Sequence, residues 1–338
     1  MKRFFQSKRD RFLASFFGFL FMTSTFNPAV VEAQAVATQP ADEAKTEDAA
    51  NKADAGDKAD AANKADGGES SDLKSEEPSY LRVDETDKGK SRALQTAIVG
   101  YEGKPNTKYD GHVVDLVGVV HIGQAEYYAD LNDRLSKYES VLYELVAPDG
   151  TRIRPEDLQR RRGLLSSMQS GMKDILNLEY QLEKIDYMAT NFRHADMSPD
   201  EFAKDFSRRG DSLWKMGARM MGAGLATQAA TGGEAGLIMA LFSDDRPRRM
   251  KQVMAKQMVD IEVATAGMDD ANGENTLIKG RNAKAFTILK EELESGKKNI
   301  AVFYGAGHLS DMADRLEKDF DMQATKTTWL DGWDLTQN

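Results

Sequence analysis

Short apolar stretches rich in β-branched residues recur along the chain, and polar or glycine-rich segments bound each of them. They cover Leu94–Tyr101, Val113–Val120, Ser140–Val146 and Ile300–Tyr304. Stretches of this length and composition predict buried strands. The segment Gly103–Asp110 is polar and turn-rich, so it predicts a hairpin between the first two strands. A last strand is expected near Ala324–Trp329.

Apolar residues at helical spacing follow several of these strands. The spacing places one apolar face on a helix over Gln124–Tyr138, and it predicts further helices over about Leu277–Leu293 and from Ser310 onward. Residues 155–295 have mainly helical patterns, and Ser198-Pro199-Asp200-Glu201 has the residues of a helix start.

Strands that alternate with helices indicate an α/β fold, with α+β as the alternative. We expect a mixed central sheet with paired strand-turn-helix units and a large, mostly helical insertion over about residues 155–295. The strand-helix-strand order from Val113 to Val146 predicts two parallel neighbouring strands whose ends open on one side of the sheet.

The N-terminal third has a different composition. Basic residues at the start, the mostly apolar run Phe12–Met22 and small residues around Ala33-Gln34-Ala35 predict a signal peptide over residues 1–35. Cleavage near Ala35 would export the protein to the periplasm or the extracellular space, and an uncleaved membrane anchor is the alternative. Residues 36–90 are expected to form a disordered linker, because their Ala, Asp, Lys and Glu residues bury too little apolar surface. The folded domain would then cover residues 91–338.

Charge and cysteine content narrow the possible functions. The formal net charge is −10, and the acidic linker carries much of it, so the folded part is only mildly acidic and nucleic-acid binding is not expected. No cysteine is present, which excludes disulfides and a cysteine nucleophile. No Gly-x-Ser-x-Gly motif occurs either.

Two motifs of the form Gly-x-x-His stand where predicted strands end. They are Gly118-Val119-Val120-His121 and Gly305-Ala306-Gly307-His308. Side chains that follow the carboxyl ends of strands face the ligand site of an open α/β sheet, so the two histidines are expected to converge. Gly118, Gly305 and Gly307 would let a ligand approach the backbone closely.

A carboxylate completes the candidate site. Glu144 is the one acid in the predicted strand Ser140–Val146, and a buried acid is costly unless it is paired, hydrogen-bonded or bound to a metal. We therefore expect Glu144 to lie beside His121. His194 and Asp196 are also close together in sequence, and loop polarity or helix capping is the preferred interpretation for both.

The two Gly-x-x-His motifs, Tyr143-Glu144-Leu145 and Arg281-Asn282 together resemble the TraB family, which includes pheromone-shutdown proteins and Tiki-type proteases. The resemblance covers about residues 94–335. It implies active-site roles for His121, Glu144 and His308, with Arg281 and Asn282 in support. In the family an acid usually precedes this arginine, whereas this chain has Gly280, so an ion pair made by that acid is expected to be absent.

These residue types allow more than one chemistry. Two imidazoles and a carboxylate, His121, His308 and Glu144, suit a divalent ion such as Mn, Co or Zn, which would activate water for peptide-bond cleavage. The leading hypothesis is therefore an exported, metal-assisted hydrolase acting on a peptide or protein substrate. A non-catalytic peptide-, metal- or haem-binding protein that uses the same cleft is the first alternative. A metal-free, esterase-like hydrolase is the second, in which Glu144 and one histidine act as an acid and base pair and Arg281 binds a substrate carboxylate or a developing oxyanion.

Overall fold

The computed structural model describes residues 80–154, 176–209, 240, 242–265 and 275–337. The predicted signal peptide and the linker up to residue 79 lie outside the described residues, as do residues 155–175, 210–239, 241 and 266–274 of the expected helical insertion. Among the described residues, no helix combines the length and the hydropathy that crossing a membrane requires.

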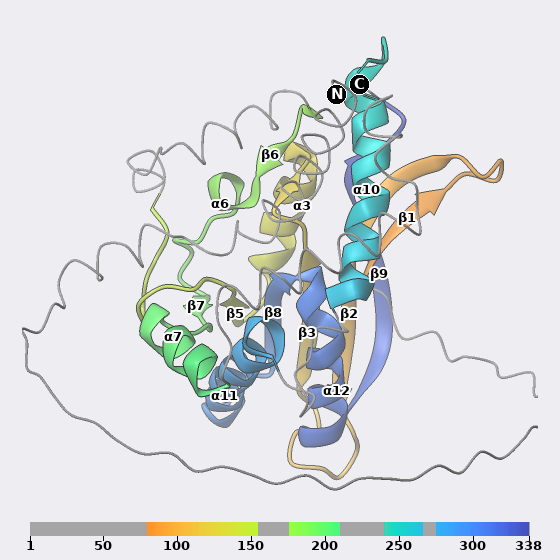
Figure 1. Ribbon diagram of the computed structural model, residues 1–338. Helices are drawn as coiled ribbons and strands as arrows, with labels where there is room; N and C mark the ends of the chain where they lie inside the picture. The colour runs from red at the N-terminus through yellow and green to blue at the C-terminus, as the bar shows by residue number, and fades with distance from the viewer. Residues whose placement is uncertain (1–79, 155–175, 210–239, 241, 266–274, 338) are drawn as a thin grey trace, which may run out of the picture.

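The described elements form an α/β fold around a seven-stranded mixed sheet, which confirms the predicted fold class (Figure 1). Its main path runs β1-β2-β3-β8-β5-β7, and β9 pairs with the other edge of β2. In chain order the strands are β1 (Leu81–Glu85), β2 (Ser91–Gly103), β3 (Val113–Val119), β5 (Ser140–Tyr143), β7 (Phe192–His194), β8 (Asn299–Gly305) and β9 (Met322–Asp334). A separate two-stranded sheet joins β4 (Ile122–Gly123) to β6 (Glu179–Tyr180).

The predicted hairpin and the last strand are both present. Strands β2 and β3 pair in antiparallel fashion, with Ile98 opposite Val117, and β9 pairs with β2 from Ala93 to Gly103. Strands β3, β8, β5 and β7 are mutually parallel. Their carboxyl ends therefore lie at one edge of the sheet.

The predicted neighbour relation between the strands of Val113 and Val146 is wrong. Strands β3 and β5 are parallel, but β8 lies between them and pairs with both. After its first residue every position of β8 is buried, so this strand gains most from a central place with a neighbour on each side. The strand of Glu144 is also shorter than predicted, since β5 ends at Tyr143 and Glu144 follows it.

Helices connect the strands. They are α3 (Ala125–Leu135), α6 (Gln181–Lys184), α7 (Pro199–Arg208), α10 (Arg246–Thr265), α11 (Arg281–Glu294) and α12 (Leu309–Asp319), with a π-helical turn η1 (Thr276–Gly280) and a 3-10 turn η2 (Ala306–His308). Figure 1 shows α11 and α12 on the face of the sheet that is turned to the viewer. The predicted start of α7 is confirmed, because Ser198 and Glu201 form a reciprocal capping box.

One domain boundary needs correction. The linker was expected to extend to residue 90, yet Leu81–Glu85 pair with β2 as β1. The described part of the expected insertion, residues 155–295, is mostly helical as predicted, and it also contains the short strands β6 and β7. Both β6 and β7 are too short to show a period of two in the sequence, so long-range pairing defines them.

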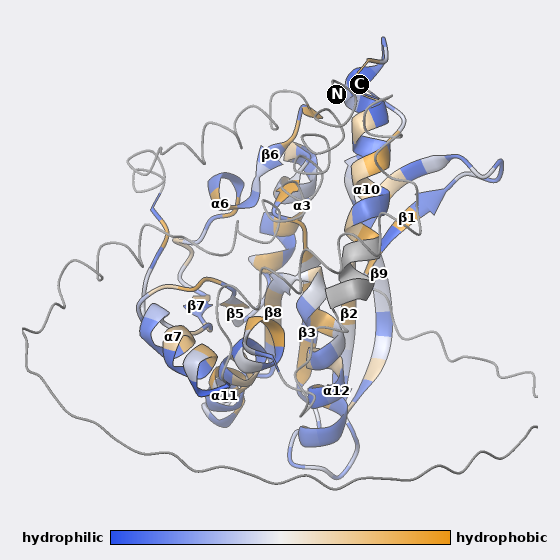
Figure 2. Cartoon of the chain, in the orientation of Figure 1, coloured by the Kyte–Doolittle hydropathy of each residue, from blue (hydrophilic) through white to orange (hydrophobic). Residues whose placement is uncertain are grey.

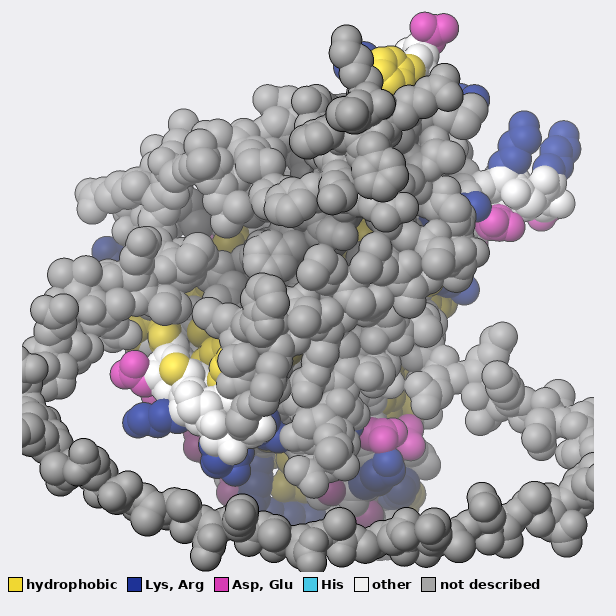
Figure 3. Space-filling view, viewed as in Figure 1, with side chains coloured by type: hydrophobic (Ala, Val, Ile, Leu, Met, Phe, Trp, Pro, Cys, Tyr) yellow, Lys and Arg dark blue, Asp and Glu magenta, His cyan; other side chains and the backbone are white. Residues whose placement is uncertain are grey.

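The core lies between the sheet and its helices. Leu116, Val302, Leu131 and Leu316 are fully buried within it. Figure 2 shows the apolar residues gathered on the central strands and polar residues on the outward faces of α11 and α12. The turn between β1 and β2 projects from the molecule and carries the exposed charged residues Glu85, Asp87, Lys88 and Lys90 (Figure 3).

Candidate functional site

Each of the four parallel strands places one polar residue of the candidate site just beyond its carboxyl end. His121 follows β3, His308 follows β8, Glu144 follows β5 and Asp196 follows β7. The register aligns the two Gly-x-x-His motifs on adjacent strands, with Gly118 opposite Tyr304 and Val119 opposite Gly305. The fold therefore brings residues from distant parts of the chain to one edge of the sheet.

The two histidines and Glu144 converge beside Gly305. The point where a Cβ atom of Gly305 would stand lies 3.3 Å from Glu144 Oε2, 3.7 Å from His121 Nε2 and 3.9 Å from His308 Cδ2. His121, Glu144 and His308 therefore converge in the structure, as predicted. A side chain at residue 305 would occupy the space that these three groups share.

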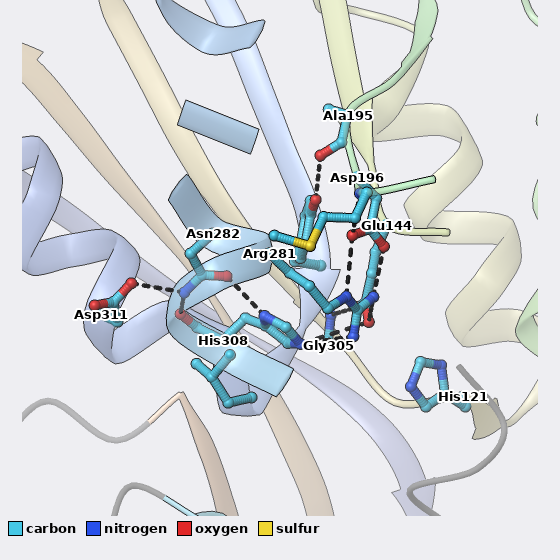
Figure 4. Close-up of polar contacts among 12 residues, drawn as sticks. His121, Glu144, Ala195, Asp196, Arg281, Asn282, Gly305, His308 and Asp311 are labelled. Carbon is cyan, nitrogen blue, oxygen red and sulfur yellow. Dashed lines mark hydrogen bonds and ion pairs between the residues drawn. The ribbon is translucent and has the colours of Figure 1, made fainter. Parts of the chain in front are cut away.

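Arg281 is the centre of a buried ion-pair network (Figure 4). Its Nε and Nη2 donate to the two carboxylate oxygens of Asp196, at 3.0 and 2.6 Å, and Nη2 also donates to Glu144 Oε1 at 2.6 Å. The π-helical turn η1 ends at Gly280 and delivers Arg281 as the first residue of α11. Glu144 Oε2 accepts a hydrogen bond of 2.8 Å from the backbone N–H of Gly305.

This network sets the ionisation of its members. Burial alone would raise the pKa of Glu144, but the charge of Arg281 and the neighbouring histidines outweigh burial, so the pKa lies well below its usual range. Burial opposes the charge of Arg281, yet Asp196 and Glu144 hold its pKa above the ordinary value. Glu144 is therefore ionised at neutral pH and is a weak base.

His308 is held in one orientation by Asn282. Asn282 Nδ2 donates to the His308 carbonyl at 3.0 Å and to Asp311 Oδ2 at 2.9 Å. Both partners only accept, so Asn282 Oδ1, 2.7 Å from His308 Nδ1, must accept a hydrogen bond from the ring N–H. Burial lowers the pKa of His308 to about 4, and the ring is neutral at pH 7.

His121 is the most accessible member of the three and lies apart from the ion-pair network in Figure 4. Its Nδ1 is 2.8 Å from Gln181 Oε1. This contact directs Nε2 toward the point beside Gly305. Gln181 and its contact with His121 were not predicted, because Gln181 lies in the expected helical insertion and carries no sequence signal for a site.

Asp196 is a second residue that sequence reasoning missed. It was assigned to loop polarity or capping, but its side chain is fully buried and binds Arg281 through both oxygens. Asp196 therefore supplies an acidic partner for Arg281 from the segment after β7, whereas the TraB family usually has an acid at the position of Gly280. No strand signal precedes it in the sequence, because Phe192-Arg193-His194-Ala195 is not an apolar run. His194, its neighbour, instead contacts the Leu145 carbonyl at 2.5 Å.

The glycines of the candidate site differ in what they contact. Gly305 lies against Glu144 and His121, as described above. A Cβ atom at Gly118 would stand 3.1 Å from the Ala97 carbonyl oxygen and 3.3 Å from Leu309 Cδ2, which indicates close packing. A Cβ atom at Gly280 would stand 2.8 Å from Asp205 Oδ2. Gly307 is exposed in η2.

The predicted metal ligands do not fit a metal ion as they are placed. Both oxygens of Glu144 already accept hydrogen bonds, and Arg281 Nη1 is 3.5 Å from His308 Nε2. An ion bound to Glu144 and His308 would face a buried guanidinium that stays charged. The described residues contain no group of three His, Asp or Glu side chains arranged to hold a metal.

The chain matches no family model, no curated protein and no solved structure. The resemblance to the TraB family therefore stays a prediction, and functional inference depends on the geometry of the site.

Burial of His308 predicts a loss of stability in acid. The unfolded chain binds a proton at His308 below the ordinary value of 6.5, whereas the folded protein binds it only near pH 4. The free energy of unfolding should therefore fall by about 2 kcal/mol between about pH 6.5 and about pH 5 from this group alone. His308→Gln should remove this part of the pH dependence in urea titrations. His112→Gln, outside the site, is the control, and an equal effect of both substitutions would contradict the interpretation.

The buried ion pair of Asp196 with Arg281 should contribute more to the free energy of unfolding than an exposed ion pair. Asp196→Ala leaves Arg281 with one buried partner fewer, so we expect it to lower the free energy of unfolding by about 3–5 kcal/mol. The control Asp314→Ala breaks the exposed pair of Asp314 with Lys318 and should have a far smaller effect, because solvent screens exposed charges. Urea denaturation of both variants measures the difference, and similar small effects would show that the network stabilises little.

Proposed function

We propose that the chain is an exported hydrolase that cleaves peptide bonds by metal-free acid and base chemistry at His121. The observation that supports this most is the convergence of His121, His308 and Glu144 at the carboxyl ends of three parallel strands. The resemblance to Tiki-type proteases favours an amide substrate, and the predicted signal peptide favours export. His121, Glu144 and His308 are the residues that were expected to bind a metal ion, and here the Arg281 network takes the place of that ion.

His121 is the base in this proposal. Its Nε2 faces the point beside Gly305, and its ring is more accessible than that of His308. Glu144 is a poor base because its pKa is well below the usual range, and general bases work best when their pKa is near the operating pH. A water molecule between His121 and the substrate carbonyl would lose its proton to Nε2 as its oxygen bonds to the carbonyl carbon.

Arg281 would stabilise the negative charge that develops on the carbonyl oxygen. The N–H groups of Nε and Nη2 already donate to Asp196 and Glu144. Arg281 therefore cannot bind a substrate carboxylate through two parallel hydrogen bonds. Among the described residues, Nη1 makes only the long 3.5 Å contact with His308 Nε2. Its N–H groups are therefore available to donate to an oxyanion. The protonated His121 would then give its proton to the leaving amine as the C–N bond breaks.

A binding protein is the second candidate. It is favoured by the satisfied state of Glu144, whose two oxygens are both occupied by groups of the protein. In that case the same residues would recognise a peptide and leave it intact.

Peptide turnover separates the two candidates. We expect the wild type to cleave members of a peptide library in the presence of a chelator, and His121→Gln to lower kcat/KM by about 10²–10⁴-fold, because it removes the base. His194→Gln is the matched control, since His194 is the last residue of the parallel strand β7 but contacts the Leu145 carbonyl, and it should retain most activity.

Equilibrium binding of the same peptides tests the second candidate, the binding protein. Saturable binding without cleavage by the wild type would favour the binding protein. Equal turnover by the wild type and His121→Gln would contradict the assignment of His121 as the base.

A further inference from the structure

Gln181 contacts His121 through both its backbone and its side chain. Its backbone N–H donates to the His121 carbonyl at 2.9 Å, and Oε1 lies 2.8 Å from His121 Nδ1. The pairing of β4 with β6 places Tyr180 opposite Ile122, which fixes the two segments side by side. The Gln181 side chain is almost completely buried, at 4% exposure.

The orientation of the Gln181 amide determines which ring nitrogen of His121 carries the proton. Oε1 is the atom that faces the imidazole, and Nε2 points the other way and donates to the hydroxyl of Tyr187 at 2.8 Å. An amide oxygen only accepts hydrogen bonds. His121 Nδ1 therefore carries the proton, and Nε2 has a free electron pair toward the point beside Gly305.

Burial keeps Tyr187 in its protonated form. The ring is fully buried, and burial raises the pKa of the Tyr187 hydroxyl far above its ordinary value. The hydroxyl is thus a neutral hydrogen-bond partner for the Gln181 amide at all working pH values.

The second histidine has the same arrangement. Asn282 Oδ1 accepts from His308 Nδ1 at 2.7 Å while Asn282 Nδ2 bonds to two acceptors. Each histidine of the paired motifs is therefore oriented by one buried amide side chain from another segment. Among the described residues, Glu144 and His308 are titratable groups that interact electrostatically with His121.

We propose that Gln181 is a positioning residue that holds His121 in the Nδ1-protonated tautomer, with Nε2 free to accept a proton from water. This inference deepens the proposed function, because a base at His121 needs Nε2 free of a proton. Gln181 itself does not touch the reacting atoms.

The tautomer can be measured without a substrate. In ¹⁵N-edited NMR spectra of the imidazole nitrogens, the wild type should show His121 protonated at Nδ1. Gln181→Met keeps the size of the side chain and removes the acceptor, so the signals should shift toward protonation at Nε2. Gln252→Met is the matched control, since Gln252 bonds to the Leu335 carbonyl away from His121, and it should leave the signals unchanged. Protonation at Nε2 in the wild type, or no change in Gln181→Met, would overturn the proposal.

Kinetics distinguish positioning from general support of the fold. Gln181→Met should lower kcat/KM by about 10–100-fold, the range found when a residue that orients a functional histidine is removed. Gln181→Glu keeps an acceptor and should recover part of the activity, with the acidic limb of the pH–rate profile moved to higher pH, because a carboxylate favours the protonated imidazole. Loss of activity in both variants with no movement of that limb would indicate a purely structural role.

The two readouts separate failure of this inference from failure of the proposed function. The expected tautomer changes without peptide cleavage by any variant would support the role of Gln181 and contradict the hydrolase. Peptide cleavage by the wild type with an unchanged tautomer in Gln181→Met would contradict only the role of Gln181.

Discussion

The buried guanidinium of Arg281 is the group on which the rest of the site depends. It bridges two carboxylates that follow different strands, Glu144 after β5 and Asp196 after β7. Either carboxylate would be costly to bury alone, because an unpaired charge in the interior loses its hydration without compensation. Arg281 therefore makes it possible for two acids to lie at the carboxyl edge of the sheet, beside the histidines.

The same interaction decides what chemistry the site favours. A cation already neutralises Glu144, so the carboxylate stays ionised and has little tendency to take a proton or to bind a second cation. His308 is neutral because it is buried, and its Nε2 lies near Arg281. Of His121, Glu144 and His308, only His121 has an accessible ring, and its Nε2 is directed toward the point beside Gly305. This division of roles favours proton transfer at His121 and charge stabilisation by Arg281.

The sequence predicted the parts of the fold that local patterns determine. The hairpin of β2 and β3, helix α3 and the strand-end positions of His121 and His308 follow from apolar periodicity and from glycine-rich turns. The insertion of β8 between β3 and β5 depends on long-range pairing, which no local pattern encodes. Asp196 and Gln181 escaped prediction for a related reason, because their roles exist only after the segments of β7 and α6 pack against the paired motifs.

We propose that Arg281, and not a metal ion, neutralises Glu144 between the paired motifs. Metal content can be measured by mass spectrometry on protein purified without a chelator, and again after addition of Mn, Co and Zn. We expect far less than one metal ion per chain, with the same content in the wild type, His121→Ala and His308→Ala. Near-stoichiometric metal in the wild type that is lost in both variants would contradict it and would restore the original metal-assisted hypothesis.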